Sequence, residues 1–154
     1  MLPMLKKAAG FIKLEHTLFS LPLLFAGAFL SKPWAGWSAL DWRRLGLIVL
    51  AGVGARTTAL AVNRLFDRAI DARNPRTKGR ELPSGQLSPA QGWLIAALGL
   101  IPYLGAAAAL DPWLLKLSPI PLIIFTVYPL MKRFTWTAHF GVGLGLALAP
   151  LGGA

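Results

Sequence analysis

Three polar residues, Asn63, Asp67 and Asp71, recur at intervals of four in a stretch that has helical character. On an α-helix this spacing places the three side chains on one face, with a drift of about 40° from each to the next. Amide and carboxylate oxygens are the ligands that a hard cation such as Mg²⁺ takes. A basic segment follows directly, and its cations are Arg73, Arg76, Lys78 and Arg80. Because guanidinium groups bind phosphate oxygens in pairs, carboxylates beside arginines predict a magnesium–diphosphate site.

The polar face continues toward the N-terminus. Arg56 precedes Asn63 by seven residues, which is two helical turns on about the same face. A charged residue at this depth in an apolar helix usually faces a cavity or a partner. We therefore expect Arg56, Asn63, Asp67 and Asp71 to form one wall of a pocket. The alternative is that these charges only form ion pairs at a helix end, while the basic segment sets topology or binds anionic lipid.

The composition around these residues is that of a membrane protein. Of the 154 residues, 55% are hydrophobic and 14% are charged, whereas a soluble domain has about 25% charged residues. The apolar residues fall in long runs, which is typical of membrane-spanning helices. The absence of cysteine excludes disulfides and thiolate metal sites. The basic residues that give the net charge of +10 lie between the apolar runs. We therefore attribute them to the orientation of the chain in a membrane and predict no nucleic-acid partner.

We predict an all-α, polytopic transmembrane bundle that forms a single membrane domain over residues 1–154. Each expected span is close to the length of about 20 residues that crosses a bilayer. The Ser88-Pro89 pair predicts the start of the third span, because serine caps helices and proline suits the first helical position. The predicted spans are about Thr17–Trp37, Leu45–Ile70, Pro89–Leu110, Trp113–Leu130 and Trp136–Gly153.

The distribution of positive charge predicts the orientation of these spans. The N-terminal arm, the segment 64–80 and the Lys132-Arg133 pair together hold eleven Lys and Arg residues, and the opposite connections hold four. Positive loops stay in the cytoplasm. We therefore expect an integral protein of a bacterial cytoplasmic (inner) membrane, with its N-terminus and the basic loop 72–88 on the cytoplasmic side.

The polar motif and its basic tail resemble the UbiA family of intramembrane aromatic prenyltransferases. Two further segments match the family in the same order along the chain. The three matching strings are Lys13-x-Glu15-His16-Thr17-x-Phe19-x-Leu21-Pro22, the motif 63–71 with Arg76-Thr77-x-x-Arg80-x-Leu82-Pro83-x-Gly85, and Tyr128-Pro129-x-Met131-Lys132-Arg133-Phe134-Thr135.

The resemblance implies a nine-helix bundle with two aspartate-rich motifs, on its second and sixth helices. Magnesium held by both motifs would bind a polyprenyl diphosphate, and the ring of an aromatic acid acceptor would attack the prenyl cation. The match implies catalytic roles for Asp67 and Asp71, which with Asn63 would bind Mg²⁺. The residues that would contact substrate are Lys13, Arg56, Asn63, Arg76, Arg80, Lys132 and Arg133, with His16 near the same cavity.

The chain departs from the family pattern in two ways. Arg64 stands where the common motif has an aspartate. This form resembles a branch linked to menaquinone synthesis with a dihydroxynaphthoate-type acceptor, and the 4-hydroxybenzoate branch of ubiquinone synthesis is the close competitor. The second motif would lie past residue 154, so we expect an N-terminal portion with half of a metal site that is inactive alone.

Two further alternatives remain from the sequence. One is a related transferase whose acceptor is haem, chlorophyllide or a lipid head group. The other is an inactive, truncated membrane protein whose basic loops bind lipid.

Overall fold

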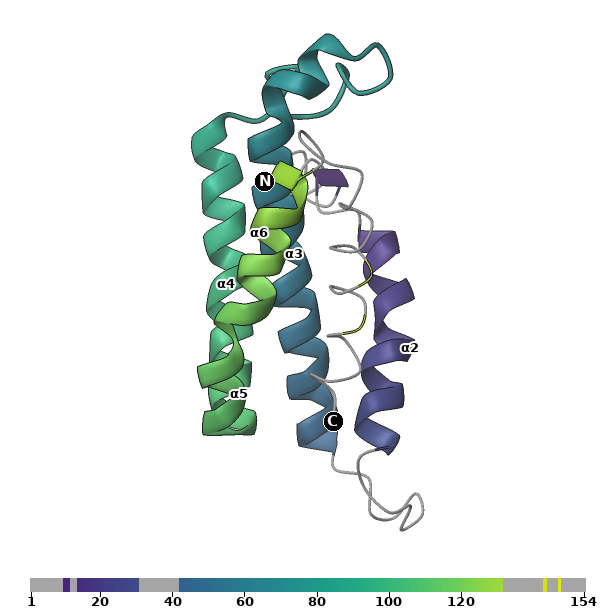
Figure 1. Ribbon diagram of the computed structural model, residues 1–154, viewed down its shortest axis with the longest axis vertical. Helices are drawn as coiled ribbons and strands as arrows, with labels where there is room; N and C mark the ends of the chain where they lie inside the picture. The colour runs from purple at the N-terminus through teal and green to yellow at the C-terminus, as the bar shows by residue number, and fades with distance from the viewer. Residues whose placement is uncertain (1–9, 12–13, 31–41, 132–142, 144–146, 148–154) are drawn as a thin grey trace.

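The computed structural model describes residues 10–11, 14–30, 42–131, 143 and 147, and every regular element in this part of the chain is a helix. The predicted all-α fold is therefore confirmed. The long helices lie side by side, and α3 contacts α2, α4 and α6 (Figure 1). The elements are α2 (Leu14–Leu30), α3 (Trp42–Arg73), α4 (Pro89–Leu110), α5 (Pro112–Leu117) and α6 (Pro119–Met131).

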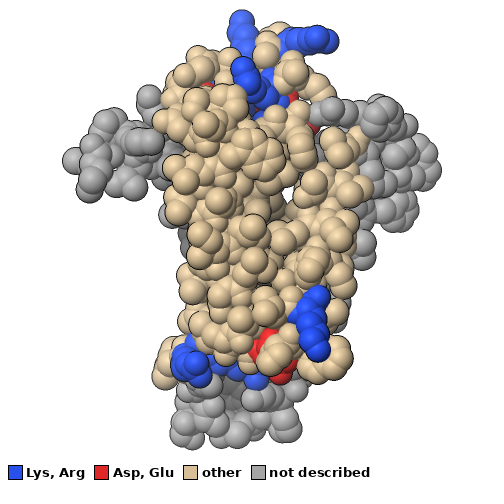
Figure 2. All heavy atoms as spheres, turned by 90° about the vertical axis from the view of Figure 1, so that its left-hand side faces the viewer, with Lys and Arg blue, Asp and Glu red and all other residues tan. Residues whose placement is uncertain are grey.

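Two of these helices, α3 and α4, are long and apolar enough to cross a membrane by length and composition. The outward face of α4 exposes large apolar side chains, among them Leu94, Leu98 and Ile101. On one face of the molecule, Lys, Arg, Asp and Glu gather at the two ends, and a broad uncharged band separates them (Figure 2). This distribution matches a bilayer, whose hydrocarbon layer excludes charge and whose two surfaces accept it.

The predicted second and third spans are confirmed as helices. The expected range Leu45–Ile70 lies inside α3, and the third prediction has the bounds of α4. Ser88 caps α4 as expected, and its hydroxyl accepts a hydrogen bond from the backbone N–H of Gln91. The Gln91 side chain accepts one from the backbone N–H of Ser88, which completes a capping box.

The first span begins earlier than expected, since α2 starts at Leu14 instead of Thr17. The expected continuation from Ser31 to Trp37 lies outside the described residues. The fifth predicted span, Trp136–Gly153, also lies outside them, except that Gly143 and Ala147 are helical.

The predicted fourth span, Trp113–Leu130, is wrong as one continuous helix. The structure divides it into α5 and α6, which meet at Ser118 and Pro119. Proline lacks a backbone N–H and its ring clashes with the preceding turn, so a helix that reaches Pro119 from the N-terminal side is interrupted there. The Tyr103 hydroxyl of α4 donates a hydrogen bond to the Ser118 carbonyl at this break, at 3.0 Å.

The segment that joins α3 to α4 is a series of hydrogen-bonded turns. The turn signals at Asn74-Pro75 and Pro83-Ser84-Gly85 are confirmed: the Asn74 carbonyl accepts from the Thr77 N–H, and Gly85 has a positive φ of 76°. We call residues 74–87 the turn segment. Its buried Leu82 and Leu87 pack in one cluster with Phe11, Ala61 and Ala96, so the segment is fixed to the end of the bundle.

Candidate functional site

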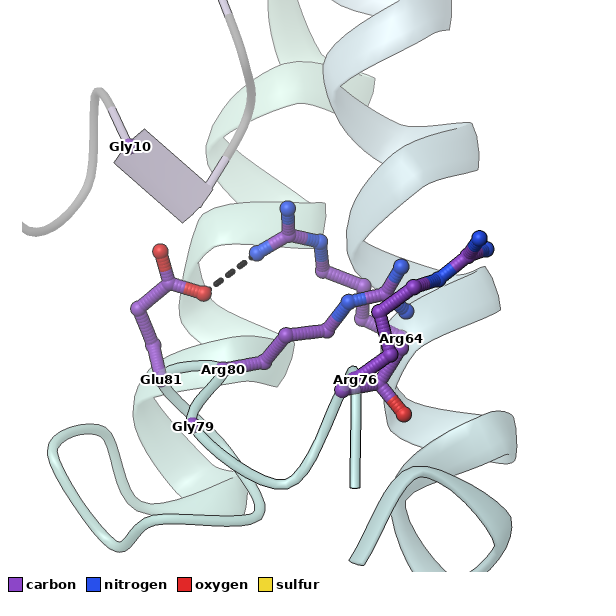
Figure 3. Close-up of a pocket in the computed structure, with 7 residues that line it drawn as sticks. Gly10, Arg64, Arg76, Gly79, Arg80 and Glu81 are labelled. Carbon is purple, nitrogen blue, oxygen red and sulfur yellow. Dashed lines mark hydrogen bonds and ion pairs between the residues drawn. The ribbon is translucent and has the colours of Figure 1, made fainter. Parts of the chain in front are cut away.

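An open pocket of about 510 Å³ lies where α3 ends and the turn segment begins (Figure 3). Its charged lining consists of arginines from α3 and from the turn segment and one glutamate, so the pocket is positive overall. The lining residues are Gly10, Arg64, Arg76, Thr77, Gly79, Arg80 and Glu81. An anion that carries more than one charge is the ligand that such a lining suits.

Asp71 anchors the inner part of the turn segment. Its Oδ2 accepts a hydrogen bond from Arg80 Nη1 at 2.8 Å, and its backbone carbonyl accepts one from the Thr77 hydroxyl at 3.0 Å. The Asp71 side chain is 11% exposed and that of Arg80 is 40% exposed. Asp71 therefore orients an arginine that a ligand in solvent can still reach.

A second ion pair joins α3 to the turn segment two helical turns before Asp71. Arg64 Nη1 donates to Glu81 Oε2 (Figure 3), and the Arg64 guanidinium lies over the Phe11 ring, 5.0 Å from its centroid. The Arg64 and Glu81 side chains are only 10% and 20% exposed. This pair therefore forms a more enclosed part of the pocket wall than the pair of Asp71 with Arg80.

Arg76 stands at an exposed position of the pocket lining. Its backbone N–H donates to Asn74 Oδ1 at 3.0 Å. A side-chain amide that accepts from the backbone two residues on forms an Asx turn, which the sequence Asn74-Pro75 favours. This turn sets the direction in which the chain leaves α3.

The structure brings together some of the predicted site residues and separates others. Arg76 and Arg80 line the pocket, and Asp71 holds Arg80. Asn63, Asp67 and Arg56 are half-buried on α3, and they are not among the described residues that line this pocket. The positions of Lys13, Lys132 and Arg133, and the side chain of His16, lie outside the described part of the chain.

Helix geometry explains this separation. Each step of four residues drifts by about 40°, so Asp71 has turned about 80° away from Asn63. A step of seven residues returns to within about 20°, which aligns Asp71 with Arg64 instead. The pocket wall is therefore built on Arg64 and Asp71. Four lining residues, Arg64, Thr77, Glu81 and Gly10, were not predicted from the sequence, although the seven-residue spacing of Arg64 and Asp71 was a usable signal.

The oxygen donors on α3 suit a hard cation in part. Among the described residues, no group of three or more His, Cys, Asp and Glu side chains gathers in one place. Asn63, Asp67 and Asp71 offer one amide and two carboxylates, and one Asp71 oxygen is bound to Arg80. Oxygen donors of this kind suit Mg²⁺, which usually takes its other ligands from water and from phosphate, although Asn63 and Asp71 point in directions about 80° apart on the helix.

Residues 19–154 match the model of the UbiA prenyltransferase family. The chain is 36% identical over 101 residues to the mitochondrial 4-hydroxybenzoate polyprenyltransferase of Schizosaccharomyces pombe, an alignment of 64% of this chain and 28% of that protein. It is 31% identical over 143 residues to the 4-hydroxybenzoate octaprenyltransferase of a Marinomonas species, with 88% and 49% of the two chains aligned.

The fold also resembles that of a solved member of this family. The apo structure of a UbiA homolog from Aeropyrum pernix superposes with a TM-score of 0.83 at 38% identity, over 91% of this chain and 49% of that one. The aligned part of the chain thus covers less than half of the length of each of these three proteins. The family match, which covers most of the sequence, and the shared helical fold together show that the chain belongs to the UbiA prenyltransferase family.

Proposed function

We propose that this chain binds a polyprenyl diphosphate in the basic pocket and takes part in the transfer of the prenyl group to an aromatic ring. The observation that carries the proposal is the position of Arg76 and Arg80, in a positive pocket at one of the two charged ends of an apolar helical bundle. A diphosphate with an isoprenoid tail has the same division into a charged head and an apolar body.

The two arginines would hold the diphosphate as it leaves. When the bond between the allylic carbon and the diphosphate oxygen breaks, negative charge develops on the leaving group, and guanidinium donors placed there stabilise it. Asn63, Asp67 and Asp71 would hold Mg²⁺ beside them, and the ion would supply further charge neutralisation at the phosphate oxygens. Asp71 would serve both functions, since it also holds Arg80.

The other residues selected from the sequence keep their proposed roles. Arg56 lies on α3 at a greater distance along the helix from the turn segment, where a polar group would suit the acceptor. Lys13, Lys132 and Arg133 would add positive charge near the diphosphate. We expect the complete reaction to need a second aspartate-rich segment, as the resemblance implies.

For the acceptor, we propose an aromatic acid of the 4-hydroxybenzoate type, which the names of the two aligned relatives support. The Asn63-Arg64 form of the motif supports a dihydroxynaphthoate-type acceptor of menaquinone synthesis as the second candidate. We place the chain in the bacterial inner membrane with the pocket on the cytoplasmic side, because the positive charge concentrates at that end of α3.

Binding of farnesyl diphosphate to the chain in lipid nanodiscs tests the donor part of this proposal. We expect binding that requires Mg²⁺ and persists at about 0.3 M salt, where exposed charges are largely screened. Binding that ignores Mg²⁺ and disappears in salt would instead identify a lipid-binding basic surface. The affinities of 4-hydroxybenzoate and of 1,4-dihydroxy-2-naphthoate, each measured on the same sample with the donor bound, would rank the two acceptors.

A further inference from the structure

We propose that Arg64 and Glu81 form a positioning pair. The pair fastens the turn segment to α3, so that Arg80 and Arg76 keep their places in the pocket. Glu81 also neutralises Arg64, which therefore orients other residues and does not bind phosphate itself. The effect of the pair on ligand binding rests on the proposed function, whereas its attachment of the turn segment to α3 does not.

Two ion pairs of opposite polarity hold the turn segment. Arg80 and Glu81 are neighbours in the chain, and they bind Asp71 and Arg64, which lie two turns apart on one face of α3. An exchange of partners would set Arg80 against Arg64 and Glu81 against Asp71, which are two pairs of like charge. The crossed polarity therefore favours the observed pairing, which places Arg80 at the pocket.

The surroundings of Arg64 separate it from solvent. Phe11 lies under its guanidinium and is fully buried, and Leu82, next to Glu81, packs in the same apolar cluster. A Cβ on Gly10 would lie 3.3 Å from Glu81 Oε1, so Gly10 lies beside the carboxylate oxygen that Arg64 does not bind. Arg64 is 10% exposed against 40% for Arg80, so Arg80 is the arginine that a ligand reaches first.

Removal of Glu81 would leave an enclosed cation without its carboxylate. A charge in such a place is costly, and the structure responds by opening to let in water. The response available here is detachment of the turn segment, which would carry Arg80 and Arg76 away from the pocket.

The test compares variants of the 154-residue chain in lipid nanodiscs by two measurements. Hydrogen exchange of the amides of the turn segment reports its attachment, and titration with inorganic diphosphate and Mg²⁺ reports the pocket. For Glu81→Gln we expect exchange that is roughly tenfold faster in the turn segment and binding that is roughly tenfold weaker, a typical loss for a supporting residue. Asp111→Asn is the control, because it makes the same change of acid to amide at an exposed residue that does not line the pocket, and asparagine also caps a helix.

A double variant separates positioning from direct binding. Arg64→Met with Glu81→Leu replaces the pair by apolar side chains, an exchange that buried ion pairs often tolerate. We expect this variant to regain slow exchange and most of the diphosphate affinity that Glu81→Gln loses. Slow exchange with weak binding would show that Arg64 contacts phosphate and would overturn the proposal. Tighter binding in Glu81→Gln would also overturn it, since Glu81 would then be competing with the ligand.

Failure of the pair and failure of the proposed function give different results. Unchanged exchange in Glu81→Gln would show that the pair fastens nothing, whatever the affinity. Absence of diphosphate binding in the unmodified chain, together with faster exchange in Glu81→Gln, would contradict the proposed pocket and the role of the pair in ligand affinity, and leave only the fastening.

Discussion

The two halves of α3 are held by different kinds of contact. In its middle, Gly54 and Thr58 meet Gly99 and Tyr103 of α4 so closely that the backbones nearly touch. At its end, Arg64 and Asp71 reach the turn segment through long charged side chains. In lipid no hydrophobic force drives helices together, so they associate through close packing of small residues.

The two halves of α3 differ in how far their contacts can move. A Cβ on Gly54 would lie 2.6 Å from the Gly99 carbonyl oxygen and 2.8 Å from the Tyr103 nitrogen. These backbone atoms cannot move without moving a helix. The ion pairs at the other end can open one at a time while the helices stay in place. The middle of α3 therefore determines stability, and its end is free to serve a ligand.

The largest expected effect is at the middle of α3. Gly54→Ala should lower the free energy of unfolding by about 3 kcal/mol, because the added methyl group overpacks a contact between backbones. Gly92→Ala is the matched control in the same interface. Its Cβ would meet the Leu65 side chain, which can move, and alanine gains about 1 kcal/mol in helix propensity. Reversible denaturation in mixed micelles measures both, and equal losses would refute the distinction.

The next largest expected effect is on ligand binding. Asp67→Asn removes a charged oxygen donor, and we expect Mg²⁺-dependent diphosphate binding to weaken about thirtyfold. The free energy of unfolding, measured on the same variant, shows how much of that loss is structural. Isothermal titration with and without Mg²⁺ separates the two contributions. Unchanged Mg²⁺ dependence would remove Asp67 from the metal site.

Arg80 tests whether the end of α3 serves the ligand. We expect Arg80→Gln to weaken diphosphate binding about tenfold, which is about 1.4 kcal/mol. Arg80→Lys keeps the charge but loses the planar donor group, so it should fall between Arg80→Gln and the unmodified chain. If both variants bind diphosphate normally but unfold more easily, Arg80 has only a structural role.

The smallest effect concerns the polar contact inside the packed middle. The Thr58 hydroxyl shares its single proton between the carbonyls of Gly54 and Ala96, and the contact with Ala96 crosses from α3 to α4 at 3.1 Å. Thr58→Val keeps the shape and should cost about 0.6 kcal/mol, the usual value for such bonds in membrane proteins. Thr58→Ser keeps the hydroxyl and should cost less. A larger loss for serine would assign the contact to packing of the methyl group.

The sequence predicted those parts of the fold that depend on local patterns. The bounds of α4 followed from Ser88, Pro89 and the length of the apolar run. The break at Ser118 was missed because the apolar run continues through it, although Pro119 and Pro121 were visible as interruptions. Apolar composition gives the length of a span, and the missing N–H groups of proline decide whether it is one helix.

The site was predictable only in part. The motif led to Asp71, Arg76 and Arg80, which are close in sequence: Asp71 binds Arg80, and Arg76 and Arg80 line the pocket. The pair of Arg64 with Glu81 depends on the path of the turn segment, which brings residues 17 positions apart into contact. Local spacing offers Arg64 nearer partners on its own helix, so it does not indicate a partner in the turn segment.

Tyr103 has a consequence for how the chain is assembled in a membrane. Its backbone packs against the position of Gly54 on α3, and its buried hydroxyl donates to Ser118, fifteen residues later at the break between α5 and α6. A hydroxyl in hydrocarbon without an acceptor is costly. Inserted alone, α4 would carry that cost, and it is relieved when α5 and α6 fold back. The segment from α4 to α6 therefore has a reason to enter the bilayer as one unit during synthesis.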